Sequence, residues 1–242
     1  MNETKSSEWR PAPSEYRTAL NLYSKMMEEA KLRLESVDLA LSGTTGLIDG
    51  AVREFCFLQL RLLCELIAPS CLAAHGDLET VQKLRKTYRK EYAADRIIAE
   101  LQKLHPEFYP RAVRQTKSGP GTYNAITRRD GFLAKQELTQ LYGRCGAVLH
   151  RGSFRGLFLK NRYKNFGFAE IKEWKNKMET LLAYHLILMA DNKTFVLFTL
   201  RNKANKDRVQ WISFETKDAV SFMKDDVEVT IESWTQLTPQ SS

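Results

Sequence analysis

The chain has 242 residues, 43% of them hydrophobic, and a formal net charge of +8 from 37 lysines and arginines against 29 aspartates and glutamates. That apolar content suffices for a packed core and excludes an intrinsically disordered chain. No stretch approaches 18 consecutive apolar residues, and the leading MNETKSSEWRPAPSE lacks the apolar core of a secretory signal, so we expect a cytoplasmic protein outside the membrane.

Two long helices are expected in the first third of the chain. Apolar residues recur at three- and four-residue steps from Ser14 to Leu41, which indicates an amphipathic helix. Ser42–Gly46 breaks it, and the threonines there can cap a second helix. That helix is apolar around most of its circumference, so it should be central, and Pro69 should end it. Within it, Arg61 and Glu65 are one turn apart and can form an ion pair.

The middle of the chain is predicted to hold two more helices separated by a loop. A charged helix should run from Leu78 to Leu104, where Pro106 stops it. Residues 107–130 contain several prolines and glycines, so we interpret them as a mobile basic loop. A fourth helix should follow from Phe132 to Leu149.

The last third changes from a helical to a strand-like pattern. A fifth helix is expected from about Phe168 to Ala190, with His185 in the core because its neighbours are apolar. The runs Thr194–Arg201, Arg208–Thr216 and Val227–Trp234 are rich in β-branched and aromatic residues, which is typical of strands. They suggest a small antiparallel meander.

Together these elements predict a mainly α fold, an antiparallel helical bundle with a small C-terminal β-meander. We expect a flexible segment at 1–13, a helical domain at 14–190, and a meander at 191–236. The meander should pack on the helices, because a segment that short could barely build its own core.

Cysteine and histidine spacing argues against a metal site. Zinc requires clustered ligands, and the one close pair here is Cys71 with His75. With no Cys-x-x-Cys pair, buried free thiols are favoured over disulfides. We therefore expect neither a metal nor a cofactor. The four cysteines are Cys56, Cys64, Cys71 and Cys145.

Positive charge is concentrated in the middle of the sequence. Residues 1–110 hold 15 basic and 16 acidic side chains, residues 111–175 hold 14 and 4, and residues 176–242 hold 8 and 9. Aromatic residues are interleaved with the cations of the middle segment. Such a composition favours phosphate attraction combined with base stacking, and the alternative is a solvated basic surface over a core of aromatic residues.

Within that segment, LYGRCGAVLHRGSFR at Leu141–Arg155 combines arginine and histidine in an otherwise apolar run. Arginine is a permanent cation whose planar fork matches a phosphate, and histidine exchanges protons near neutral pH. Taken singly, Arg144 can be a surface cation and His150 can cap a helix end. A six-residue step on a helix turns by about 600°, which leaves the two about 120° apart unless the helix ends or bends, as Gly146 permits.

The Arg-x5-His spacing from Arg144 to His150, followed by Arg151, resembles the Arg-x4-6-His signature of HEPN domains, small helical domains of which many are ribonucleases. The resemblance implies a homodimer in which two Arg-His sets share one cleft. It also implies metal-independent cleavage of RNA by its own 2′-hydroxyl, with His150 transferring a proton and Arg144 stabilising the transition state.

Six further cations are predicted to contact the RNA backbone, which positions a strand without reading its sequence. They are Arg128, Arg129, Arg151, Arg155, Lys160 and Arg162.

Three functional hypotheses follow. The favoured one is a metal-independent endoribonuclease with Arg144 and His150 as catalytic residues. The alternatives are a noncatalytic RNA- or nucleotide-binding module, and a helical protein-interaction component of a defence or toxin–antitoxin system with an antitoxin or similar partner. Nucleotide triphosphatase, serine hydrolase and metalloprotease motifs do not occur in the sequence.

Overall fold

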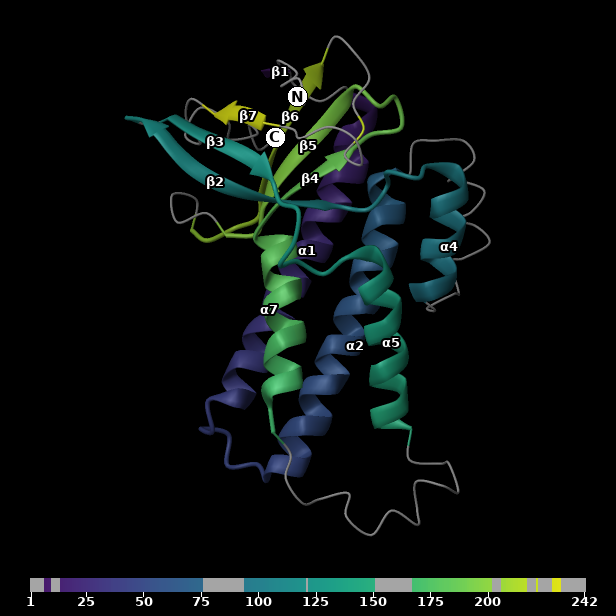
Figure 1. Ribbon diagram of the computed structural model, residues 1–242, viewed down its shortest axis with the longest axis vertical. Coiled ribbons are helices and arrows are strands. Elements are labelled where there is room, and N and C mark those ends of the chain that lie inside the picture. Colours follow the sequence, from purple (N-terminus) through teal and green to yellow (C-terminus); the bar gives the residue numbers. More distant parts are fainter. Residues whose placement is uncertain are drawn as a thin grey trace.

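The computed structural model describes residues 7–9, 14–75, 94–120, 122–150, 167–201, 206–216, 221 and 228–231. These ranges contain five helices and seven strands. The helices form an elongated bundle, and the strands form an antiparallel sheet across one end of it (Figure 1). The fold is therefore mixed α/β, and the expectation of a mainly α bundle with only a small C-terminal meander was wrong.

Helix α1 (Ser14–Leu41) has the predicted bounds. Its side chains at three- and four-residue steps are buried, which fits an amphipathic helix that lays one stripe on the core. The fully or almost fully buried residues of this stripe are Leu20, Tyr23, Met27, Ala30, Leu34 and Val37.

Helix α2 (Asp49–Ala74) is central, as predicted, but it does not end at Pro69. Proline removes one backbone hydrogen bond from a helix interior. The five residues that follow, from Ser70 to Ala74, are all buried, and their packing offsets that loss. The helix is long and apolar enough to cross a membrane by length and composition, yet 61% of its most apolar window is buried within the protein. A helix buried in the core of a protein can have the same length and apolar composition.

Helix α4 (Ala94–Leu104) ends where the predicted third helix ends. Helix α5 (Lys135–Leu149) ends at the predicted residue but begins three residues later than the predicted start at Phe132. The first part of the predicted third helix, up to residue 93, lies outside the described residues. The Glu137 carboxylate fastens the start of α5: it accepts a hydrogen bond from the backbone N–H of Ala134 at 2.9 Å and pairs with Lys177 at 2.8 Å. This pair ties α5 to the neighbouring helix of the bundle.

The predicted basic loop at residues 107–130 is instead largely a hairpin. Strand β2 (Arg111–Gly119) pairs with β3 (Thr122–Thr127) in antiparallel register, with a bulge between Lys117 and Gly119. Gly119 and Pro120, two of the residues that suggested a loop, lie at the end of β2 and directly after it. The flanking residues, which include Val113 and Ile126, have the β-branched character of strands.

Helix α7 (Ala169–Ala183) is shorter than the predicted fifth helix, because the chain passes directly into strand β4 (Tyr184–Leu188). This strand lies between β2 and β5 (Thr194–Thr199), and four of its five residues are buried. A short, continuously apolar run can be a buried helix or a buried strand, and the pattern alone does not distinguish them. His185 is fully buried, which confirms its predicted core position.

The sheet is assembled from distant parts of the chain. Strand β6 (Gln210–Thr216) pairs with β5, as the predicted meander requires, but β7 (Glu228–Ile231) pairs with β3. Strand β1 (Ser7–Trp9), in the segment expected to be flexible, pairs with β6. The strand order β1-β6-β5-β4-β2-β3-β7 thus joins strands from both sides of residue 190.

The core joins the helices to one face of the sheet. Ile187, Val196 and Phe198 belong to the same buried cluster as the inner stripe of α1 and most of α2. Within it, the Tyr23 hydroxyl lies 2.7 Å from Nε2 of His185, and Nδ1 of His185 lies 3.0 Å from the Leu182 carbonyl. All four cysteines are buried and free, as predicted.

Acid should weaken the fold through His185. Burial lowers the pKa of this histidine from 6.5 to about 4, against the opposing hydrogen bond to Leu182. Because the folded pKa is depressed, its contribution is complete above the unfolded pKa and is lost as pH falls from about 6.5 towards 4. We expect the free energy of unfolding in urea to fall by up to about 3 kcal/mol from this residue between pH 7 and 4.

The double variant Tyr23→Phe/His185→Phe tests this, because it removes the titrating imidazole and replaces both partners of the Tyr23–His185 bond by apolar groups; the Leu182 carbonyl loses its histidine partner at every pH. Its stability should change less between pH 7 and 4 than that of the wild type. An unchanged pH dependence would contradict the assignment.

Candidate functional site

The last two turns of α5 lie at the end of the bundle furthest from the sheet, beside α2 (Figure 1). Arg144 and His150 therefore share one end of the molecule. Helix α5 runs unbroken to Leu149, and His150 is its C-cap residue with an extended backbone. The helix does not end between the two side chains, so they are directed to different neighbours.

Arg144 is directed to α7, where it forms a bidentate ion pair with Glu170. Its Nε and Nη2 atoms donate to the two carboxylate oxygens at 2.7 and 3.0 Å. Arg53 of α2 lies 3.8 Å from the same carboxylate and stacks over the Phe57 ring at 4.7 Å. The hydrogen bonds from Arg144 lower the pKa of the Glu170 carboxyl. One carboxylate thus holds two arginines.

His150 lies beside a different arginine, Arg61 of α2. A β-carbon added to Gly146 would stand 3.4 Å from Nη1 of Arg61 and 3.8 Å from Cδ2 of His150. The absence of a side chain at Gly146 therefore leaves the guanidinium and the imidazole near one shared space. His150 is exposed, and within the described part of the chain its ring takes part in no hydrogen bond.

Arg61 is held in place by three contacts. Its Nε donates to Glu65 at 2.9 Å, which confirms the predicted ion pair, and its Nη2 donates to the Tyr142 hydroxyl at 3.0 Å. The guanidinium also lies 4.6 Å from the centre of the Tyr142 ring. Of its three nitrogens, Nη1 is the one that faces Gly146. Arg61 was not predicted as a site residue; a glycine inside a helix, where a neighbouring side chain can approach closely, was the one available signal.

Cys145, next to Arg144, is not a reactive group. Its side chain is fully buried, and burial raises the pKa of its thiol to about 12. Only a thiolate is a good nucleophile or metal ligand. Among the described residues there is also no group of three or more His, Cys, Asp or Glu side chains that could hold a metal ion.

The six predicted RNA-contacting cations are not all at this end. Arg128 and Arg129 follow β3, at the sheet and away from the end of α5 (Figure 1). Arg129 is exposed, whereas Nε of Arg128 is buried and has no hydrogen-bond partner within the described residues. The other four lie outside the described residues: Arg151, Arg155, Lys160 and Arg162.

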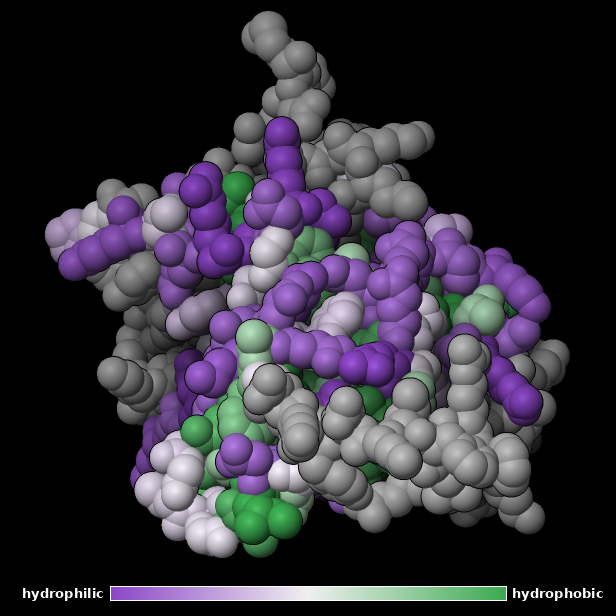
Figure 2. Space-filling view, turned by 60° about the horizontal axis from the view of Figure 1, so that its bottom comes forward, coloured by the Kyte–Doolittle hydropathy of each residue, from purple (hydrophilic) through white to green (hydrophobic). Residues whose placement is uncertain are grey.

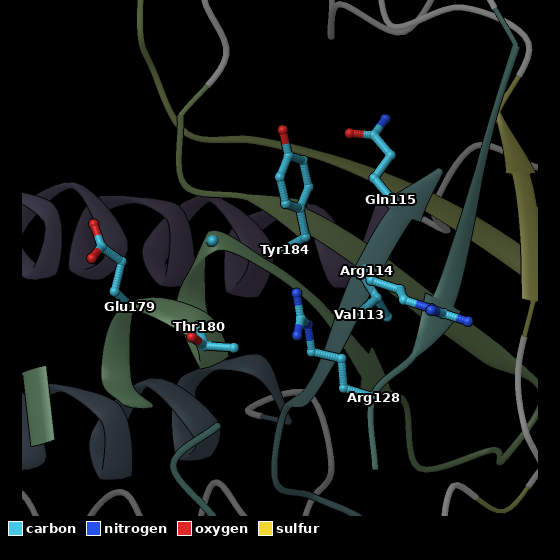
Figure 3. Close-up of a pocket in the computed structure, with 8 residues that line it drawn as sticks. Val113, Arg114, Gln115, Arg128, Glu179, Thr180 and Tyr184 are labelled. Atoms are coloured by element: carbon cyan, nitrogen blue, oxygen red, sulfur yellow. The ribbon is translucent and has the colours of Figure 1, made fainter. Parts of the chain in front are cut away.

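A surface cleft of about 430 Å³ lies beside Arg128, between the last turns of α7 and strands β2 and β4 (Figure 3). It marks a second place where a ligand could bind, at the sheet end of the bundle.

Comparisons with protein-family models, with curated proteins and with solved structures found no match to the chain.

The Arg144–Glu170 pair should contribute modestly to stability. The Arg144 side chain is 46% exposed, so solvent screening limits the pair to about 0.5–1 kcal/mol in a double-mutant cycle with Arg144→Met and Glu170→Met. The folded pKa of Glu170 is lowered, so this contribution is present above the unfolded value and is lost on acidification through the folded value. The coupling free energy of this cycle, measured by urea unfolding, should be smaller at pH 3 than at pH 7. Equal coupling free energies at the two pH values would show that the ion pair does not contribute to stability.

Proposed function

We propose that the chain is a metal-independent endoribonuclease whose reacting groups lie at the end of α5. The observation that carries the proposal is the exposed imidazole of His150 next to the fixed guanidinium of Arg61, with Arg144 on the same helix end. The spacing that resembles the HEPN signature supports it as well. RNA supplies its own nucleophile, so the protein needs a proton-transfer group and cations to stabilise negative charge.

In this proposal the 2′-oxygen attacks the adjacent phosphorus, and the bond from phosphorus to the 5′-oxygen of the next nucleotide breaks. The proton of the 2′-hydroxyl goes to a base, and the leaving 5′-oxygen receives a proton from an acid. His150 takes one of these two roles, since the imidazole can do either. The products are a 2′,3′-cyclic phosphate and a free 5′-hydroxyl.

The two arginines are proposed to act differently. Arg61 is preorganised by Glu65 and Tyr142, so Nη1 can face the phosphate without reorganisation in the transition state. Arg144 is paired with Glu170. It can bind a phosphate only if this ion pair breaks, or if the guanidinium contacts the carboxylate and the phosphate at the same time. With Arg53, the site has three arginines against two carboxylates, which keeps it attractive to an anion.

The proposed active form is a homodimer, as in the HEPN resemblance. A second chain would bring a second His150, and the two imidazoles could then divide the acid and base roles. The same end of the bundle exposes apolar surface (Figure 2), where Leu47 and Ile48 of the α1–α2 turn are 52% and 79% exposed. Apolar side chains exposed together favour an interface. They equally favour the alternative of a protein-interaction component.

Noncatalytic RNA or nucleotide binding is the second candidate function. The bidentate Arg144–Glu170 pair favours it, because a guanidinium engaged by a carboxylate has fewer donors left for a transition-state phosphate. Arg144 and Arg61 could then attract RNA while no proton is transferred.

Cleavage of labelled single-stranded RNA in EDTA decides between these functions. We expect wild type to cut RNA but not DNA of the same sequence, since DNA lacks the 2′-hydroxyl. His150→Ala should lower the rate by about 10²-fold or more, and Arg61→Gln by about 10–10²-fold. Circular dichroism checks that each variant is folded. If folded His150→Ala cuts RNA at the wild-type rate, the proposed role of His150 is refuted. If neither the wild type nor the variants cut RNA but the wild type binds it, noncatalytic RNA binding is the function that is supported.

Two glycines of α5 provide a matched pair for the geometry. A leucine at Gly146 would occupy the space between Arg61 and His150, whereas Gly143 has no atom within 4 Å of its β-carbon position. Both changes remove a glycine from a helix interior, which favours the helix by up to about 1 kcal/mol. Gly146→Leu should lower cleavage about tenfold or more, and Gly143→Leu should leave it within twofold. Equal effects on the rate would show that the shared space is not used.

A further inference from the structure

The cleft at the sheet end lies at the opposite end of α7 from the Arg144–Glu170 pair. Glu170 is in the first turn of α7, and Thr180 and Ala183 in its last turns line the cleft. The rise of an α-helix separates these positions by about 15–20 Å along the axis. The cleft is therefore a separate place on the molecule, and what it binds does not rest on the ribonuclease proposal.

Arg128 is the most informative residue of this cleft. Its backbone N–H donates to the Ala112 carbonyl at 2.8 Å, which continues the β2–β3 pairing and fixes the residue at the end of β3. Its guanidinium is directed from the strand end into the space framed by Thr180, Tyr184 and Val113 (Figure 3). Its Nε is buried without a hydrogen-bond partner within the described residues. Buried donors are nearly always paired, so this guanidinium is unusual in having no protein acceptor for its Nε among the described residues.

The charges around the cleft favour an anion. Of the two arginines in its lining only Arg128 is directed into the space, and the one carboxylate in its wall, Glu179, is paired with Lys175 at 2.7 Å. Arg114 is exposed, and its guanidinium turns away from Tyr184 and Arg128 in Figure 3. The cleft therefore carries uncompensated positive charge, and Arg128 is the cation directed into it.

Size and an aromatic wall narrow the class of anion. A volume of about 430 Å³ exceeds the needs of a lone phosphate and lies in the range of small-molecule sites. The half-buried Tyr184 also lines the cleft, and its ring points away from the Arg128 guanidinium (Figure 3). Aromatic rings stack on nucleobases with little regard to base identity, and arginine binds phosphate through two parallel hydrogen bonds.

We propose that this cleft binds a nucleoside monophosphate, with the phosphate on Arg128 and the base against Tyr184. The same chemical group is available from a free nucleotide or from one nucleotide of an RNA strand, and competition between the two distinguishes these sources.

Calorimetric titration of the full chain with AMP tests the site. Wild type should bind AMP at least tenfold more tightly than adenosine or inorganic phosphate, because each of these lacks one of the two contacts. Arg128→Gln should weaken AMP binding tenfold or more. Arg114→Gln removes the same charge from a side chain turned away from the cleft, so it should weaken binding less than threefold.

Folding is controlled by circular dichroism and the midpoint of thermal unfolding. Arg128→Gln removes a buried unpaired donor, so its midpoint without ligand should not fall. If the variant nevertheless fails to fold, Arg128→Lys serves in its place; it keeps the charge but loses the planar fork, and AMP should bind it several-fold more weakly. Absence of AMP binding to folded wild type, or equal losses in Arg114→Gln and Arg128→Gln, would overturn the proposal.

A short single-stranded RNA then assigns the source of the nucleotide. Displacement of AMP by RNA in wild type indicates a site for one nucleotide of a strand, and the absence of displacement indicates a site for a free nucleotide. Cleavage by His150 needs no contact with Arg128 in a short substrate. AMP binding and RNA cleavage are therefore independent measurements. AMP binding by a wild type that does not cut RNA would refute the ribonuclease proposal alone, and RNA cleavage by a wild type that does not bind AMP would refute the cleft proposal alone.

Discussion

The buried hydrogen bond between Tyr23 and His185 is a long-range contact that ties the sheet to the bundle within their shared core. It joins α1 to the first buried residue of β4, directly after α7 ends. Both ring nitrogens of the neutral histidine are satisfied, one by the tyrosine hydroxyl and one by the Leu182 carbonyl. Because α7 and β4 are continuous in sequence, fixing His185 fixes the position of the sheet over the end of the bundle. The cleft beside Arg128 forms at this junction.

The opposite end of the bundle is held by a different kind of interaction. There, arginines from α2 and α5 are matched by Glu65 and Glu170, and aromatic rings lie under the guanidinium groups of Arg53 and Arg61. Such half-exposed pairs add little stability individually. Their effect is to fix orientation: Arg61 has two of its three nitrogens occupied, so the third has a defined direction. That direction, and not the spacing of Arg144 and His150 along α5, decides which cation lies beside the histidine.

Local sequence patterns predicted what depends on local periodicity. The bounds of α1, the fourth helix, the buried cysteines and the core position of His185 all follow from which residues are apolar and how they are spaced. The hairpin was missed because its turn residues suggested a loop throughout, and β4 was missed because a buried apolar run fits a helix or a strand equally well.

Long-range partners were beyond sequence reasoning for a different reason. Tyr23 and His185 are 162 residues apart, and Arg61 and Tyr142 are 81 apart. Each pair meets only after the helices pack. The pairing of β7 with β3 likewise depends on a hairpin that the turn residues concealed.

Arg144 and Arg128, two cations of the basic middle segment, lie at opposite ends of the molecule and differ in whether a carboxylate pairs with them. Arg144 already has a carboxylate partner, so a phosphate that approaches it must displace or share Glu170, and much of the gain from the new contact is lost. Arg128 has no such partner to give up within the described structure, and its backbone is fixed by the hairpin. A phosphate on Arg128 therefore gains more free energy per contact than one on Arg144. If RNA reaches both ends, its affinity should come mainly from the sheet end and its chemistry from the end of α5.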